Sequence, residues 1–276
     1  MKSKYGKKEK KNENDQFYTS PDYAQKCINT LNEFFDISSF DICIEPSAGT
    51  GSFSNKLPEN SIAYDLDPKD SKIIKQDFFT VKYDRGNILV IGNPPFGRVC
   101  STAIKFFNHA AKFADVIAFI IPQTFQRLSI QNKLDLNFHL IYNEDINERI
   151  FTPDMAAKCC FQIWKRKDTK REKVTLKTIH KDWTFLPFGP IDDNGQPTPP
   201  ENADFAFLAF GGKIGKIQTE NLKDLRPKSW HWIKTPDPDL LIKRFESLDY
   251  SISNKTVRQN SLGRGELVWL YEQKYG

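Results

Sequence analysis

The strongest constraint on the fold is a series of short apolar runs that alternate with helix-type patterns between residues 15 and 175. Each run has five or six residues, and turn-forming residues lie between the runs and the helical patterns. Continuous apolar runs of this length are typical of strands that are buried on both faces of a parallel sheet. We therefore expect an α/β doubly wound domain.

The expected elements follow the chain in order. Strands are expected at residues 41–45, 62–66, 72–76, 88–92 and 116–121, and helices at 21–35, 101–113 and within 125–135. Two further runs, 137–143 and 158–165, have no long helix between them, so they are expected to form an antiparallel pair at the sheet edge. The prediction is a Rossmann-like, mainly parallel seven-stranded sheet with an antiparallel edge strand.

Charge and composition divide the chain into three parts. Residues 1–11 hold six lysines against one glutamate, which accounts for the whole net charge of +5. We expect residues 1–14 to be a disordered basic arm, which is either solvated or holds phosphates. Residues 15–175 are the expected α/β domain. Residues 176–276, rich in aromatics, prolines and glycine pairs, are expected to be a smaller domain with one helix at 238–248.

Hydrophobicity and cysteine content indicate where in the cell the protein is expected. The sequence contains no apolar run long enough to span a membrane and no secretory leader, so we expect an intracellular protein, cytoplasmic or nuclear. The five cysteines are an odd number without C-x-x-C spacing, which predicts reduced core residues and no metal site.

A glycine-rich loop follows the first expected strand. The strand ends at Glu45 and runs into Pro46-Ser47-Ala48-Gly49-Thr50-Gly51. Glycine lets the backbone approach a ligand closely, and an acid at a strand end can accept hydrogen bonds from an amino group. The loop lacks the third glycine of G-x-G-x-x-G and any G-K-[ST], which disfavours NAD and a P-loop.

Acidic residues also end the next two expected strands. Asp65 is placed to accept hydrogen bonds from ribose hydroxyls, and Asp77 stands beside Phe78, whose ring could cover an adenine. A single acid at a strand end is more often solvated than functional. Three of them beside a glycine loop predict one nucleoside-shaped site at the carboxyl edge of the sheet.

The fourth strand ends in the tetrapeptide Asn93-Pro94-Pro95-Phe96. Two consecutive prolines fix φ and remove two backbone donors, so acceptors remain. The Asn93 side-chain oxygen and the Pro94 carbonyl could hold the hydrogens of a poorly nucleophilic aromatic amine, with Phe96 stacked on its ring. The alternative is a simple turn with a packing phenylalanine.

In this order the motifs resemble the class I S-adenosylmethionine-dependent methyltransferases, specifically the adenine-N6 family of the N-P-P-F type that includes DNA adenine methyltransferases. The resemblance covers roughly residues 15–166. Residues Asp15 to Pro21 look like the family's N-terminal cofactor motif, in which Thr19 or Ser20 would cap a helix that begins at Pro21. The C-terminal hundred residues match no family feature.

The resemblance implies roles for individual residues. Asn93, Pro94, Pro95 and Phe96 would hold the target base, Glu45 with the glycines the methionine part of S-adenosylmethionine, Asp65 the ribose, and Asp77 with Phe78 the adenine. The complete implied cofactor set is Tyr18, Thr19, Glu45, Pro46, Ala48, Gly49, Gly51, Asp65, Leu66, Asp77 and Phe78. Phe151-Thr152-Pro153 lies where relatives place an aromatic against a flipped base, although core packing accounts for it equally well.

The motifs indicate the methyl-transfer reaction more specifically than they indicate its substrate. DNA adenine is the preferred target, with a flipped base and with residues 176–276 as the target-recognition or nucleic-acid-binding region. RNA adenine is the main alternative, protein glutamine N5 a further one, and a non-catalytic binding subunit the last. Candidate nucleic-acid contacts are the cluster at residues 165–173 and, in the smaller domain, Gly211 to Lys216, Trp230, Trp232, Arg258 and Gly263-Arg264-Gly265.

Overall fold

The computed structural model describes residues 17–154, 157–257 and 259–276. The chain divides into two compact units: unit 1 comprises the chain up to Pro122 together with Lys133–Glu172, and unit 2 comprises Gln123–Asn132 together with Lys173–Gly276. Residues 123–132 group with the C-terminal unit, which was not expected from the sequence. The expected arm, residues 1–14, lies outside the described residues.

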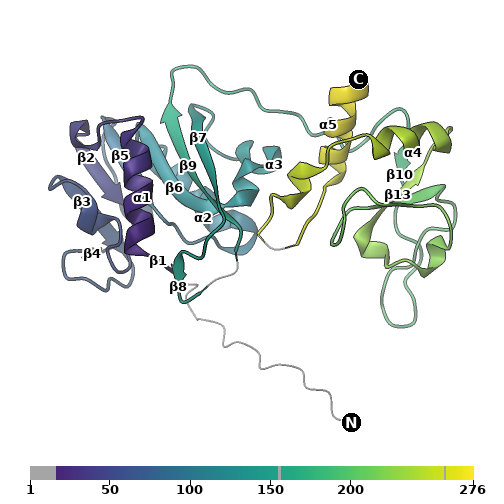
Figure 1. Cartoon of the computed structure of the whole chain (residues 1–276), viewed down its shortest axis with the longest axis horizontal. Helices are drawn as coiled ribbons and strands as arrows, with labels where there is room; N and C mark the ends of the chain where they lie inside the picture. Colours follow the sequence, from purple (N-terminus) through teal and green to yellow (C-terminus); the bar gives the residue numbers. More distant parts are fainter. Residues whose placement is uncertain (1–16, 155–156, 258) are drawn as a thin grey trace, which may run out of the picture. The chain divides into compact units, whose positions relative to one another are not determined.

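Unit 1 is built on a sheet of seven strands in the part of the chain that the structure describes, in the order β4-β3-β2-β5-β6-β9-β7 (Figure 1). Neighbouring strands are parallel from β4 to β6, and β9 is antiparallel to both β6 and β7. The strands are β2 (Ile42–Glu45), β3 (Ser61–Asp65), β4 (Ile74–Lys75), β5 (Ile88–Gly92), β6 (Val116–Pro122), β7 (Phe138–Ile146) and β9 (Cys159–Arg166).

The expected α/β class and mainly parallel sheet are confirmed. The reversed strand is β9, which lies one place in from the edge, and β7 forms the edge itself. The expected strand at residues 72–76 shrinks to the two residues of β4, both exposed. This outermost strand has a neighbour on one side only, so fewer backbone hydrogen bonds hold it in an extended form.

Helices cover both faces of the sheet, because side chains of the central strands alternate between the two faces. On one face α1 (Pro21–Asn32) packs with Cys43, Leu89 and Ile91 into one apolar cluster. On the other, Phe107 of α2 (Ser101–Ala110) contacts Phe138 and Trp164 edge to face. Ser20 caps α1 by accepting a hydrogen bond from the Tyr23 amide at 3.3 Å. It is one of the two residues, Thr19 and Ser20, that were expected to cap this helix.

A two-stranded ribbon joins distant parts of unit 1. The strand β1 (Tyr18–Thr19) pairs antiparallel with β8 (Phe151–Thr152). The amide of Ser20 also donates to the carbonyl of Ile150 at 2.8 Å. The ribbon holds the N-terminal motif in place against the segment between β7 and β9.

Unit 2 has its own sheet and its own apolar core. Its sheet order among the described residues is β10-β13-β11-β12, and Phe205, Phe207, Phe245 and Tyr271 are buried in its core. Its elements are α3 (Leu128–Gln131), β10 (Thr184–Phe185), β11 (Phe205–Leu208), β12 (Ile217–Gln218), β13 (Trp230–Lys234), α4 (Pro238–Glu246) and α5 (Arg264–Tyr275).

Helix α5 was not expected from the sequence. Its sequence has two glycines near the start and no one-sided apolar stripe, so it lacks the local signals of a helix. Burial against neighbouring elements stabilises it instead. All five cysteines are buried thiols, as expected. No helix among the described residues is both long enough and apolar enough to cross a bilayer.

Candidate active site

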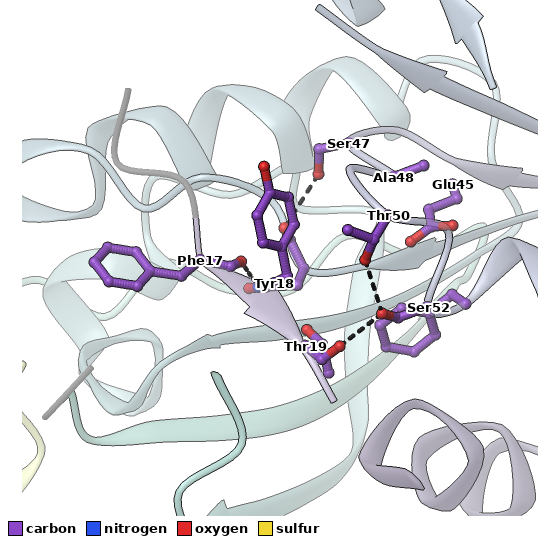
Figure 2. Close-up of a pocket in the computed structure, with 10 residues that line it drawn as sticks. Phe17, Tyr18, Thr19, Glu45, Ser47, Ala48, Thr50 and Ser52 are labelled. Carbon is purple, nitrogen blue, oxygen red and sulfur yellow. Dashed lines mark hydrogen bonds between the residues drawn. The ribbon is translucent and has the colours of Figure 1, made fainter. Parts of the chain in front are cut away.

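A pocket opens at the carboxyl ends of β2 and β5, where β1 and the glycine loop meet Asn93. It encloses about 240 Å³ of empty space, part of it open to solvent. Figure 2 shows the labelled lining residues arranged around it. The lining combines residues from three separate segments of unit 1: Phe17, Tyr18, Thr19, Glu45, Ser47, Ala48, Thr50, Ser52, Phe53 and Asn93.

Glu45 is the acidic group of the pocket. Its residue surface is 2% exposed, and its Oε2 accepts a hydrogen bond from the Ser54 amide at 2.7 Å. Burial raises the pKa of Glu45 to about 8, against the opposing effect of that hydrogen bond. A cation placed beside the carboxylate would favour its ionised form, so the pocket suits an ammonium group.

The glycine loop is shaped by contacts that need glycine. Gly49 has φ of +54°, and a Cβ at this position would lie 2.7 Å from the ring of Tyr18. The amide of Gly49 donates to Asp65 Oδ2 at 2.8 Å, and the other Asp65 oxygen accepts from the Asp67 amide at 2.8 Å. Asp65 therefore supports the loop directly, and each of its oxygens has a further lone pair for a ligand hydroxyl.

Asn93 stands where the glycine loop, the N-terminal strand and β5 converge. Its Nδ2 donates to the carbonyl of Phe17 at 3.3 Å, and its own carbonyl accepts from Ser47 Oγ at 3.1 Å. Its Oδ1 is buried and has no hydrogen-bond partner among the described residues. A buried acceptor without a donor is costly, so this oxygen points to a ligand that supplies an N–H or O–H.

Thr19, which also lines the pocket, has a buried oxygen of the same kind. Its Oγ1 is also buried without a hydrogen-bond partner in the described part of the chain, while its carbonyl accepts from Ser52 Oγ at 2.6 Å (Figure 2). Thus one hydroxyl and one amide oxygen of the pocket lining are both buried without a hydrogen-bond partner in the described residues.

Phe96 lies beyond the pocket lining, on the core side of the tetrapeptide. It packs against the main apolar cluster, and its ring centroid lies 6.3 Å from that of Phe151 in an edge-to-face arrangement. The carbonyl of Phe96 accepts from the Thr102 and Ala103 amides at the start of α2, which anchors the tetrapeptide. Phe151 itself is buried in the core, as the packing alternative proposed.

The expected adenine contacts at the third strand end are Asp77 and Phe78, and the structure shows the surroundings of both. Asp77 caps a short 3-10 turn by accepting from the Phe79 amide at 2.9 Å. Phe78 is only 2% exposed and stacks on Phe106, so it has no ring face to offer, whereas Phe79 is 39% exposed. Leu66, the other apolar candidate, is 68% exposed beside Asp65.

Of the sequence-derived candidates, the structure brings Tyr18, Thr19, Glu45, Ala48 and Asn93 together in the pocket lining. Pro46, Gly49 and Gly51 shape the same loop, and the remaining candidates lie outside the lining. Sequence reasoning missed Phe17, Ser47, Thr50, Ser52 and Phe53 as lining residues. Three of these carry hydroxyl groups, Ser47 and Thr50 in the glycine loop and Ser52 directly after it, and this clustering of hydroxyls was the signal available.

Much of the basic cluster at residues 165–173, which begins at the end of β9, serves the fold. Lys165 pairs with Asp115, and Arg166 donates to the carbonyls of Ala114 and Ala111. Arg171 donates to the Phe138 carbonyl at 2.6 Å, and its guanidinium lies over the Trp164 ring. These contacts favour the structural interpretation of the cluster over a nucleic-acid groove.

Several of the candidate nucleic-acid contacts in unit 2 are also engaged in packing within the protein. Trp232 is a fully buried core residue, and Gly265 packs its backbone against Leu176 at the start of α5. Trp230 is partly buried, and Arg264 lies over the Phe185 ring at 5.2 Å. Arg258 falls outside the described residues.

The sheet is Rossmann-like, mainly parallel, with β9 antiparallel between β6 and β7. A family model described as an EDM2 methyltransferase-like domain matches residues 60–177, which is less than half of the chain. This match begins after the glycine loop and includes Asp65, Asp77 and the Asn93 tetrapeptide. No curated protein matches the chain.

Several solved structures are similar to the chain at low identity. A putative RNA methyltransferase from Pyrococcus horikoshii is 17% identical over 59% of this chain and 93% of its own, with a TM-score of 0.43. A putative class I S-adenosylmethionine-dependent methyltransferase from Listeria monocytogenes is 14% identical over 59% and 65%, with a TM-score of 0.47. Magnesium protoporphyrin IX methyltransferase from Synechocystis, with the cofactor bound, is 11% identical over 53% and 79%, with a TM-score of 0.39.

Proposed function

We propose that this protein transfers a methyl group from S-adenosylmethionine to the N6 amino group of adenine in a nucleic acid, with DNA as the preferred substrate. The observation that carries the proposal is the buried, unpartnered Oδ1 of Asn93 at the wall of the pocket. A target amine would supply the missing donor there. The resemblance of the tetrapeptide to N-P-P-F motifs and the methyltransferase family model across it support the same reaction.

The pocket residues fit the proposed cofactor. When bound, S-adenosylmethionine supplies an electrophilic methyl group on a sulfonium. Glu45 would hold the amino group of its methionine part, and the unpartnered Thr19 hydroxyl would accept or donate one further hydrogen bond. Asp65 would take a ribose hydroxyl while it continues to support Gly49.

Asn93 would work through its acceptor oxygen. The Nδ2 group is already engaged by the Phe17 carbonyl, so the amide is oriented with Oδ1 toward the target. Asn93 Oδ1 and the Pro94 carbonyl would accept the two N–H groups of the amine, which favours a pyramidal nitrogen whose lone pair is less delocalised into the ring. This contribution comes from positioning and electrostatics and needs no strong general base.

The proposal is tested by supplying labelled S-adenosylmethionine with duplex DNA, single-stranded DNA, RNA and a glutamine-containing protein extract. Digestion of the products to nucleosides and amino acids identifies the labelled group. We expect label in N6-methyladenosine or its deoxy form, with duplex DNA labelled most. Label confined to RNA would show that the substrate is RNA and not DNA. Label confined to glutamine would overturn the proposal.

A further inference from the structure

Two hydrogen bonds tie the proposed acceptor residue to the two segments that line the proposed cofactor pocket. Ser47 Oγ, in the loop after β2, donates to the Asn93 carbonyl at 3.1 Å. The Phe17 carbonyl, just before β1, accepts from Asn93 Nδ2 at 3.3 Å. The three residues come from separate segments of unit 1 and meet only at the carboxyl edge of the sheet.

Both segments are themselves fixed to one another. Ser52 Oγ of the glycine loop donates to the Thr19 carbonyl at 2.6 Å, and the Tyr18 ring covers Gly49. The β1–β8 ribbon holds the other side of the N-terminal segment. A ligand that rigidifies either segment therefore restricts the main chain and the side chain of Asn93 at the same time.

We propose that Ser47 is a positioning residue that couples the cofactor site to the acceptor oxygen of Asn93, so that a bound cofactor strengthens binding of the target amine. The inference rests on the proposed function and adds a regulation to the same site. By linkage, the target then strengthens cofactor binding by the same factor. The Ser47 hydroxyl is suited to this role because it is the donor that joins the glycine loop to β5.

The test is a binding cycle with a non-reactive cofactor analogue, S-adenosylhomocysteine, and an adenine-containing oligonucleotide that the wild-type protein methylates. In the wild type the analogue is expected to raise oligonucleotide affinity at least about fivefold, within the usual range of coupling. In Ser47→Ala this factor should fall below about twofold, while analogue affinity alone stays close to wild type and kcat falls. Ser47→Thr, which keeps the hydroxyl, should restore the coupling.

Thr50→Ala is the matched control, because it removes a pocket hydroxyl from the same loop that bonds to Ser52 and not to Asn93. It is expected to change analogue affinity and to keep the wild-type coupling factor. If Ser47→Ala fails to fold, Ser47→Cys replaces it, since a thiol is a weak donor of similar size. Wild-type coupling in Ser47→Ala, or in the Ser47→Cys variant that replaces it, overturns the proposal. Loss of analogue binding in these variants also overturns it, because Ser47 would then be a cofactor ligand.

Failure of the proposed function has a different signature. A wild-type protein that binds no S-adenosylhomocysteine, or that methylates no adenine, contradicts the proposed function before any variant is compared. A wild-type protein that does both, with no change of oligonucleotide affinity on analogue binding, contradicts only the coupling.

Discussion

At Asn93, two hydrogen bonds to distant segments hold one residue, one through its side chain and one through its main chain. The Phe17 carbonyl accepts a hydrogen bond from the side-chain amide, and the Ser47 hydroxyl donates one to the main-chain carbonyl of Asn93. The buried Oδ1 then has no partner in the described residues, which is a desolvation cost that a ligand could remove. The proposed chemistry therefore depends on how the side-chain amide of Asn93 is oriented.

Replacing Asn93 by alanine removes this acceptor. We expect Asn93→Ala to lower kcat at least about 100-fold, the scale of losing one preorganised polar group at a reacting centre, with little change in cofactor affinity. Single-turnover methyl transfer measures the effect. The control is Asn87→Ala, at the opposite end of β5, whose amide also donates to a backbone carbonyl, that of Ser39. Near-normal turnover by Asn93→Ala would remove Asn93 from the mechanism.

The pH dependence of cofactor binding should report Glu45. Its pKa is raised by burial to about 8, so at neutral pH the free protein holds a proton that a bound ammonium would expel. Cofactor affinity should therefore rise as pH increases toward about 8 and level off above it, by up to about tenfold per unit. Calorimetry at pH 7 in buffers of different ionisation enthalpy measures the released proton.

The matched variant for this experiment is Glu45→Gln, which keeps the shape and loses the ionisable group. It should bind the cofactor more weakly and with no proton release at pH 7. If the wild type and the variant released the same number of protons, Glu45 would not be the group that contacts the ammonium.

Among the elements, the segment 123–132 decides how unit 2 is held together. Arg127, which precedes α3, forms a buried ion pair with Glu266 of α5, with Nε 2.6 Å from Oε1. Arg127 also donates to Ser261 Oγ at 3.1 Å, and Glu266 accepts from the Gly263 amide at 2.9 Å. Ten residues that directly follow β6 are thereby bound to a helix that begins more than 130 positions later.

Breaking this pair from one side should destabilise unit 2 strongly. We expect Arg127→Met or Glu266→Gln to lower its free energy of unfolding by about 3–5 kcal/mol, because the remaining charge stays buried without its partner. Denaturant unfolding followed by tryptophan fluorescence measures it. The exposed pair Lys177–Glu272 is the comparison, and Lys177→Ala should cost less than about 1 kcal/mol. Equal effects at both pairs would contradict the role given to Arg127.

In the molecule as a whole, every residue that lines the pocket lies in unit 1. Ligands that bind only the folded form stabilise the part that holds them. Cofactor at 100 times its dissociation constant should therefore stabilise unit 1 by about 2.7 kcal/mol. Hydrogen exchange should slow around residues 17–19 and 45–53, and much less in residues 173–276. Protection that appeared mainly in the C-terminal residues would place the cofactor elsewhere.

Much of the fold could be predicted from the sequence, because its signals are local. The strand at residues 88–92 was predicted with its observed bounds, and Ser20 with Pro21 marked the start of α1, since apolar runs, caps and prolines act over a few residues. Helix α5 was missed because its stability comes from burial. The burial of Phe78 and the exposure of Phe79 were not predicted, because neighbouring aromatics, and not the motif itself, determine which of the two phenylalanines is exposed.

By itself the sequence determined the α/β class, and it placed Glu45, Asp65 and Asn93 at strand ends, where the proposed site lies. Periodicity and turn chemistry suffice for these because they depend on near neighbours. Only the tertiary structure decided that Ser47 and Phe17 meet at Asn93, that Asn93 Oδ1 has no protein partner in the described residues, and that residues 123–132 join unit 2. These outcomes depend on contacts between residues tens of positions apart, which no local pattern encodes.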